Sequence, residues 1–158
     1  MQTRDITLTV NGETVRASVP VRQNLVDFLR NGLGLTGSHA GCEHGVCGAC
    51  TMEVDGIAVR GCLMLAVQAD GASITTVEGL ADEARAAALR AAFHARNALQ
   101  CGYCTPGMLT SALEYVESGG AADRAAIREH LSGNYCRCTG YQAIVDAVCD
   151  VIEGRVTA

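Results

Sequence analysis

The sequence contains no lysine and no long apolar run. All 12 basic residues are arginines, and 17 acidic residues bring the net charge to −5. Without lysine, a P-loop phosphate site and a Schiff-base mechanism are excluded. No apolar run approaches the roughly 20 residues of a membrane span, and an acidic chain without a basic block argues against nucleic acid as a partner. A hydrophobic content of 49% excludes disorder.

The N-terminal segment also lacks the features of an export signal. Residues 1–5 lead directly into an alternating strand pattern, with no basic segment before an apolar one and no twin arginine. We therefore expect a cytoplasmic protein. In a reducing compartment, 9 cysteines point to metal or redox chemistry, because an odd count is a poor disulfide framework.

The first half has the pattern of a small mixed sheet with one helix and one long loop. Alternating apolar residues on both sides of Asn11-Gly12 predict a hairpin with a type I′ turn. A helical spacing follows, then a loop rich in glycine and cysteine, a second hairpin and a β-branched strand. In chain order, these strands, helix and loop are expected at residues 5–10, 14–19, 24–30, 31–50, 51–54, 57–59 and 73–77.

The pattern becomes helical near Glu78-Gly79, which predicts two domains, 1–78 and 79–158. Four helices are expected in the second domain, enough for a bundle. Their expected N-terminal residues are Asp82, Thr105 with Pro106 after it, Asp123, and Thr139 in a capping box with Gln142.

Four cysteines in and after the long loop have the spacing C-x4-C-x2-C-x11-C. They are Cys42, Cys47, Cys50 and Cys62. This is the spacing of plant-type [2Fe-2S] ferredoxins, in which three thiolates on a tight loop wrap around the cluster and a fourth comes from a more distant element. Neighbouring glycines let the backbone approach the sulfurs. The alternative, a zinc site, usually takes two short cysteine pairs instead.

A second group is formed by Cys101-x2-Cys104 and Cys136-x-Cys138. On chemistry alone, this group leaves open a second [2Fe-2S] cluster, a zinc site, or a thioredoxin-like redox pair at Cys101 and Cys104. Cys104 and Cys138 each precede a predicted helix start, where the helix dipole favours the negative charge of a cluster. The ninth cysteine, Cys149, lies on the last helix and is expected to be a buried packing residue.

Taken together, these segments resemble the small iron–sulfur subunits of xanthine-dehydrogenase-type molybdenum hydroxylases, including the small subunit of carbon monoxide dehydrogenase. The segments that carry the resemblance are GCEHGVCGAC at 41–50, Cys62, QCGYCTPG at 100–107 and SGNYCRCTGY at 132–141.

The resemblance implies an α+β fold, with an N-terminal β-grasp plant-type ferredoxin domain followed by a C-terminal four-helix-bundle [2Fe-2S] domain. It favours a second cluster over zinc for the second cysteine group. It also implies that Gln100 contacts a pterin and that Cys138 lies close to it. The first cluster would be the one nearer the flavin, and the second the one nearer the molybdenum centre.

The resemblance further implies two partners. A large subunit would hold the molybdopterin cofactor and oxidise the substrate, and a medium subunit would hold FAD, in a heterotrimer or a dimer of heterotrimers. This chain would relay single electrons between them and would have no catalytic residues of its own. The substrate stays open among N-heterocycles or purines, aldehydes and carbon monoxide. Two competing interpretations are a structural zinc module and a free-standing ferredoxin.

Overall fold

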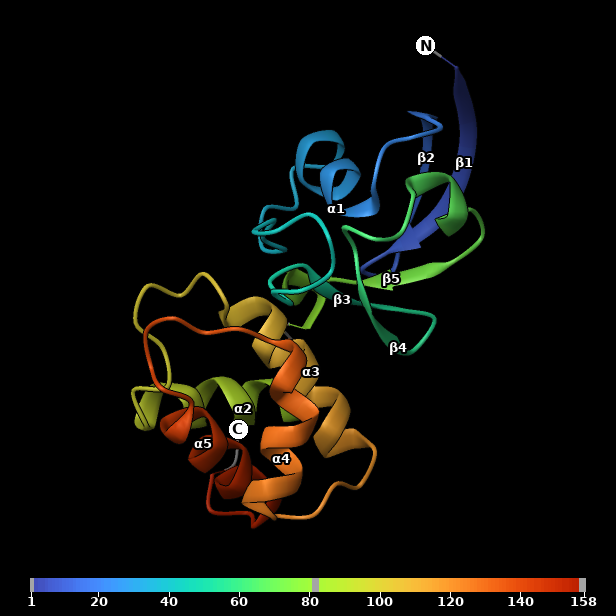
Figure 1. Ribbon diagram of the computed structural model, residues 1–158. Coiled ribbons are helices and arrows are strands. Elements are labelled where there is room, and N and C mark those ends of the chain that lie inside the picture. Colours follow the sequence, from blue (N-terminus) through green and yellow to red (C-terminus); the bar gives the residue numbers. More distant parts are fainter. Residues whose placement is uncertain (1, 81–82, 157–158) are drawn as a thin grey trace.

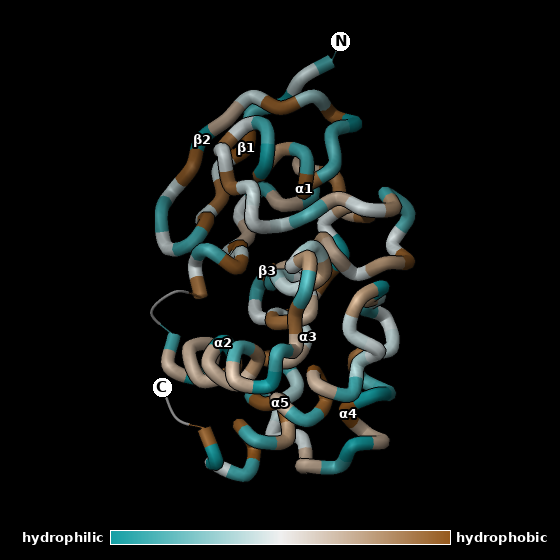
Figure 2. Tube along the Cα trace, turned by 90° about the vertical axis from the view of Figure 1, so that its left-hand side faces the viewer, coloured by the Kyte–Doolittle hydropathy of each residue, from teal (hydrophilic) through white to brown (hydrophobic). Residues whose placement is uncertain are grey.

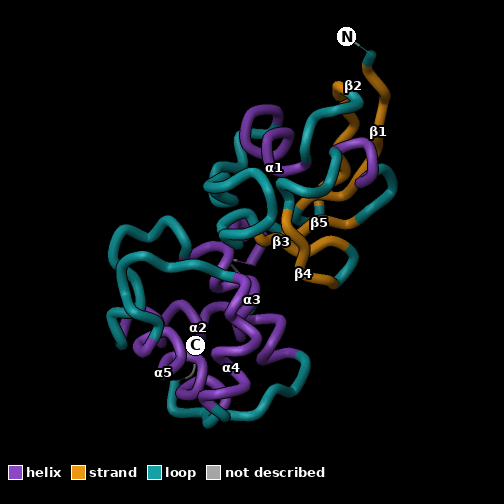
Figure 3. Tube along the Cα trace, in the orientation of Figure 1, coloured by secondary structure: helices purple, strands orange, loops and turns teal. Residues whose placement is uncertain are grey.

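Two units lie one above the other in the part of the chain that the computed structural model describes, residues 2–80 and 83–156 (Figure 1). The upper unit contains all five described strands, a short helix and a long loop, and the lower unit is helical (Figure 3). This is the predicted α+β organisation. No described helix is both long and apolar enough to cross a membrane.

The sheet consists of two hairpins joined through one short strand. Its order is β2-β1-β5-β3-β4, and β5 pairs parallel to β1 and antiparallel to β3. The strands are β1 (Thr3–Val10), β2 (Glu13–Pro20), β3 (Thr51–Val54), β4 (Ile57–Arg60) and β5 (Ser73–Thr75). Both predicted hairpins are confirmed. Asn11 and Gly12 both have positive φ, as a type I′ turn requires.

Strand β5 is shorter than the predicted strand 73–77. The Thr76 backbone N–H donates to the Asn11 side-chain oxygen at 2.9 Å, and the Thr76 hydroxyl donates to the Glu78 carboxylate. These side-chain bonds replace the strand pairing. The chain then enters a 3-10 turn over Val77–Leu80.

The predicted helix at 24–30 is present as α1 (Leu25–Asp27), continued by a wider turn over Phe28–Gly32. The Asn24 side chain accepts from the Asp27 N–H at 2.8 Å and so caps the helix. Leu25, Phe28 and Leu29 are buried in the core of the sheet unit. The helix thereby anchors the start of the long loop that carries the first cysteines.

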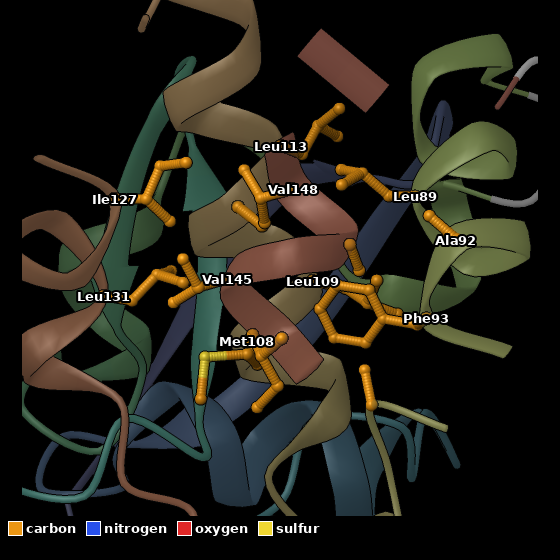
Figure 4. Close-up of a cluster of buried hydrophobic side chains, with 14 of the residues drawn as sticks. Leu89, Ala92, Phe93, Met108, Leu109, Leu113, Ile127, Leu131, Val145 and Val148 are labelled. Carbon is orange, nitrogen blue, oxygen red and sulfur yellow. The ribbon is translucent and has the colours of Figure 1, made fainter. Parts of the chain in front are cut away.

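The second unit contains the four predicted helices packed around a single apolar core (Figure 4). Their bounds are α2 (Ala84–Ala95), α3 (Thr105–Glu117), α4 (Arg124–His130) and α5 (Gln142–Ile152). Leu89 and Phe93 of α2 point towards Leu109 of α3 and Val148 of α5 in this core. Helix α3 also packs against β3, and Figure 2 shows it at the junction of the two units.

Three of the four predicted helix starts need correction, and that of α4 is confirmed. Asp82 lies outside the described residues, and the side chain that caps α2 is that of Glu83. Helix α3 has Cys104 at its N-cap, so Thr105 is already the first helical residue. Asp123 caps α4 as predicted, accepting from the Ala125 N–H at 3.0 Å. The start of α5 also differs from the prediction, because the expected cap residue Thr139 contacts a sulfur of the second cysteine group.

Candidate metal centres

The first cysteine quartet is assembled by the β3–β4 hairpin and the loop that precedes it. Cys50 immediately precedes β3 and Cys62 follows β4, and the register pairs Thr51 with Arg60. The hairpin therefore brings its two flanking cysteines to the same end, where the Gly61 N–H donates to the Cys50 carbonyl at 3.2 Å. Both cysteines are buried, whereas Cys42 and Cys47 are partly exposed on the loop.

The thiols of this quartet have contrasting protonation. Backbone N–H groups of His44 and Cys47 lower the pKa of Cys42 to about 6, and the Cys47 N–H lies 3.4 Å from the Cys42 sulfur. Burial raises the pKa of Cys50 to about 11. The loop thus supplies donors for a thiolate, while the buried thiol needs the positive charge of bound metal to lose its proton.

The loop backbone also comes close to one of the sulfurs. A Cβ atom placed on Gly41 would lie 3.2 Å from the Cys47 sulfur and 3.6 Å from the Tyr103 ring. A side chain at this position would therefore press on a thiol. These residues fit a thiolate-bound cluster, which needs four sulfurs, close backbone and aimed N–H groups.

The second quartet joins the start of α3 to the segment before α5. Cys101 and Cys138, which are distant in sequence, place their sulfurs 3.5 Å apart. Burial raises the pKa of Cys104 to about 12. At Cys136 burial acts in the same direction, but the Thr139 hydroxyl and N–H outweigh it and lower the pKa of that thiol. This quartet therefore pairs a donor-stabilised thiol with a buried one, as the first does.

The predicted capping box at Thr139 is wrong. The Thr139 hydroxyl lies 3.1 Å from the Cys136 sulfur, and the Thr139 N–H donates to that sulfur at 3.4 Å. Helix α5 begins at Gln142, whose side-chain oxygen accepts from Arg128. Cys138 consequently lies before a turn and not at a helix N-terminus. The Thr139 hydroxyl also accepts from the Tyr141 N–H at 3.2 Å, in the turn before the helix, so Thr139 contacts the thiol and the turn but does not cap α5.

Tyr141 is a neighbour of this site that the sequence did not single out. Its hydroxyl accepts from the Cys136 N–H at 2.9 Å. Its φ of 68° is in the left-handed region, which a residue with a side chain adopts only at a cost. The backbone thus turns sharply between the cysteine pair and α5.

The structure places Gln100 beside the second quartet. Its side-chain nitrogen donates to the Cys138 carbonyl at 3.0 Å, and the residue is exposed. This position brings together the two residues that the resemblance implies for pterin contact. Cys149 lies apart from both quartets, 4% exposed in the helical core, as a packing residue should.

A seam of hydrogen bonds joins the two quartets. The Tyr135 N–H, next to Cys136, donates to the carbonyl of Cys47 at 2.8 Å. Tyr103, next to Cys104, stacks on His39 with ring centres 4.5 Å apart and donates its hydroxyl to the Ala40 carbonyl. In Figure 1 the loop of the sheet unit faces the helical unit at this level.

None of the nine cysteines forms a disulfide. Within residues 2–80 and 83–156, no three histidine, cysteine, aspartate or glutamate side chains are spaced to hold a single metal ion.

Comparison with known proteins assigns a family to each unit. Residues 8–73 match the family described as "2Fe-2S iron-sulfur cluster binding domain". Residues 76–149 match the family described as "[2Fe-2S] binding domain". The two matches divide the chain between the sheet unit and the helical unit.

Two relatives and one solved structure illustrate matches over nearly the whole length of both chains. The chain is 53% identical to caffeine dehydrogenase subunit gamma of Pseudomonas sp. (strain CBB1), over 94% of this chain and 90% of that protein. It is 53% identical to the nicotine 6-hydroxylase small subunit of Paenarthrobacter nicotinovorans, over 92% and 88%. Among solved structures, quinoline 2-oxidoreductase from Pseudomonas putida 86 aligns with a TM-score of 0.91 and 46% identity, covering 98% of this chain and 96% of that one.

Proposed function

Because this chain belongs to the family of small iron–sulfur subunits of molybdenum hydroxylases, we propose a specific electron route through it and a partner at each end. The chain is the electron-transfer subunit of a multi-subunit oxidoreductase and holds two [2Fe-2S] clusters. Each cluster supplies one-electron chemistry when bound. The residues of this chain hold, tune and connect the two sites.

We infer that Cys42, Cys47, Cys50 and Cys62 are the ligands of one cluster, and that Cys101, Cys104, Cys136 and Cys138 are those of the other. The contact between the Cys101 and Cys138 sulfurs, the pairing of Cys50 and Cys62 across one hairpin, and the N–H groups aimed at Cys42 and Cys136 support this assignment. Hydrogen bonds to sulfur are one of the means by which a protein sets the potential of a cluster. The Thr139 hydroxyl at Cys136 has no equivalent in the hydrogen bonds to Cys42, so we expect the two sites to differ in potential.

The proposed route crosses the seam between Cys47 and Tyr135. A peptide bond connects Tyr135 to Cys136, and one hydrogen bond of 2.8 Å connects it to the Cys47 carbonyl. The two quartets are thus linked by covalent bonds interrupted by one hydrogen bond. This continuous connection is the single observation that most favours a relay over two independent sites.

Partner surfaces are proposed next to each quartet because apolar side chains are exposed there. In the described residues the large hydrophobic side chains that are exposed include Val46, Leu63 and Leu65 near the first quartet, and Leu99, Tyr103 and Tyr135 near the second. Exposed apolar groups that gather in one place mark interaction sites. We propose that the medium FAD-binding subunit covers the first group and the large molybdopterin-binding subunit the second, in a heterotrimer or a dimer of heterotrimers.

Gln100 is proposed to contact the pterin of the large subunit. Its amide is exposed while it donates to the Cys138 carbonyl, so its oxygen is free to accept from an external donor. This arrangement would connect the pterin to the backbone of a cluster ligand. We further propose that the complex works in the cytoplasm, a reducing compartment in which cysteines more often bind metal than form disulfides.

The substrate is proposed to be an N-heterocyclic compound. The relatives reported above are named for caffeine, nicotine and quinoline, all of which are N-heterocycles. The test is to purify the complex and measure reduction of an artificial acceptor with N-heterocycles and with aldehydes. Turnover of aldehydes alone would contradict the proposal.

The ligand assignment predicts that substitution in one quartet spares the other. In the purified complex, Cys138→Ser should remove or strongly perturb the second cluster, because it deletes a thiolate ligand, and Cys42→Ser should do the same at the first. Iron content and the two EPR signals of the reduced complex measure this. Cys149→Ser is the matched control and should leave both signals unchanged. Unchanged spectra in Cys138→Ser would refute the assignment.

A further inference from the structure

The geometry points to Asn134 as a positioning residue that fixes the two cysteine quartets relative to each other. This inference rests on the proposed relay, for which the separation of the two clusters sets the rate of electron transfer. Asn134 is two residues before Cys136, yet its side chain bonds to the other unit. It is therefore placed to transmit any shift of one quartet to the other.

Asn134 is 2% exposed, and its side chain is fully hydrogen-bonded. Its nitrogen donates to the Gly48 carbonyl at 3.1 Å and to the Thr51 hydroxyl oxygen at 3.3 Å, both in the sheet unit. Its oxygen accepts from the Ser111 hydroxyl of α3 at 2.9 Å and faces Arg60 of β4 at 3.4 Å. One amide thus joins the first cysteine loop, the hairpin and the helical unit.

The backbone around this amide is packed so closely that it cannot shift without breaking contacts. A Cβ atom on Gly48 would lie 2.5 Å from the Gly133 carbonyl and 2.7 Å from the Asn134 side-chain nitrogen. A Cβ atom on Gly107 would lie 2.1 Å from the Gly48 carbonyl. Gly48 is therefore held between two segments of the helical unit, next to Cys47.

The amide lies beside the proposed electron route. Gly48 follows Cys47, and Asn134 precedes Tyr135, so the amide bond to Gly48 and the Tyr135–Cys47 hydrogen bond run side by side. Two oxygen acceptors face the side-chain nitrogen, and the Thr51 hydroxyl already donates its proton to the Gly48 carbonyl. Both acceptors also receive hydrogen bonds from other groups, the Gly48 carbonyl from Thr51 and the Thr51 hydroxyl from Arg60. The group that faces the two oxygens must nevertheless be a donor, because a third oxygen there would be repelled. An asparagine meets that need, and an isosteric aspartate does not.

The test compares Asn134→Asp with the wild-type chain in the purified complex. The aspartate places a carboxylate oxygen against the Gly48 carbonyl, so the loop moves away, while Arg60 lies close enough to compensate the new charge. We expect both clusters to be retained. The magnetic splitting between the two reduced clusters should weaken, and electron exchange between them should slow several-fold. EPR and rapid reduction kinetics measure these two effects.

Ser111→Ala is a milder second variant, because it removes only one donor to the Asn134 oxygen. It decides the test if Asn134→Asp does not fold. Asn31→Asp makes the same charge change at an exposed residue and is the matched control. Splitting and exchange rates equal to wild type in both Asn134→Asp and Ser111→Ala would overturn the inference while leaving the relay intact. A wild-type complex without two clusters would instead overturn the proposed function.

Discussion

At the scale of single residues, each quartet combines a thiol that readily becomes a thiolate with one that does not. Backbone N–H groups favour the thiolate at Cys42, and Thr139 favours it at Cys136. Burial holds Cys50 and Cys104 in the protonated form. Loading of each site must therefore release protons from the buried thiols, as metal binding to thiols generally does.

Because Gly107 lies close to Gly48, we predict that a methyl group added at position 107 destabilises the protein. Gly107→Ala would place Cβ 2.1 Å from the Gly48 carbonyl, and overpacking of this kind costs about 1–3 kcal/mol of unfolding free energy. At an open helical position the same change would stabilise by roughly 0.5–1 kcal/mol. The sign measured by chemical denaturation therefore decides the prediction. A more stable variant would show that the two units are not in contact there.

At the scale of elements, α5 is fixed to the end of α2 by a buried carboxylate. Asp150 is 6% exposed at its side chain and bonds to Arg96 at 2.6 Å and to Arg155 at 3.1 Å. The hydrogen bond from Arg96, followed by that from Arg155, lowers the pKa of this carboxyl. Unfolded aspartate has a pKa of about 3.9. The stabilisation is complete above that value and is lost as the pH falls through the lower folded pKa.

Asp150→Asn should lower the unfolding free energy at neutral pH by about 1–2 kcal/mol, because the hydrogen bonds lose their ionic character while both arginines remain partly solvated. Thermal unfolding measured across pH checks this. The difference from wild type should shrink in acid, where the wild-type carboxyl also becomes neutral. Asp5→Asn, on the exposed side of β1, should have little effect. A difference that persists below the folded pKa would contradict the ionic explanation.

The elements that depend on local pattern were predictable, and those that depend on distant partners were not. Both hairpins and all four helices of the second unit follow from apolar spacing and turn residues. Strand 73–77 was predicted too long because Asn11, distant in sequence, competes for the Thr76 backbone. The capping box at Thr139 failed because the threonine bonds to the Cys136 sulfur instead.

The same distinction holds for the candidate site, where features set by local sequence could be predicted and features set by distant contacts could not. The cysteines could be assigned from spacing, since ligand geometry constrains local sequence. Asn134 could not be assigned, because its partner Gly48 is 86 residues away and no local pattern records a contact of that range. Tyr141 belongs to the segment 132–141 that carries the family resemblance, but nothing in the sequence assigns it a role of its own. Its hydroxyl contact with the Cys136 N–H depends on a left-handed backbone that the sequence does not signal.

At the scale of the whole molecule, the two units have separate apolar cores. We infer from these cores that the units correspond to residues 1–78 and 79–158. Phe93 is buried in the helical core and Phe28 in the sheet core, so truncating either should weaken its own unit first. Each truncation should lower the unfolding free energy of its unit by about 3–5 kcal/mol.

Denaturation of the two variants, followed by far-ultraviolet circular dichroism and by the EPR signal of each cluster, checks this division. Phe93→Ala should lose the second cluster at lower denaturant than the first, and Phe28→Ala should reverse that order. The two variants serve as controls for each other. Simultaneous loss of both clusters in both variants would show that the chain unfolds as one unit.

Two quantities govern electron transfer between the clusters: the driving force and the distance. The glycine contacts at the seam constrain the distance but not the driving force. Around the second quartet, a side-chain hydroxyl, that of Thr139, contacts a cysteine sulfur, so a substitution at such a side chain can adjust the driving force of transfer. Between the quartets, Gly48 and Gly107 leave no volume for a methyl group. The distance that an electron must cross between the clusters is thus fixed by close backbone contacts that only glycine permits. Adaptation of this subunit to a new donor or acceptor must then proceed through potentials and outer surfaces, with this distance held constant.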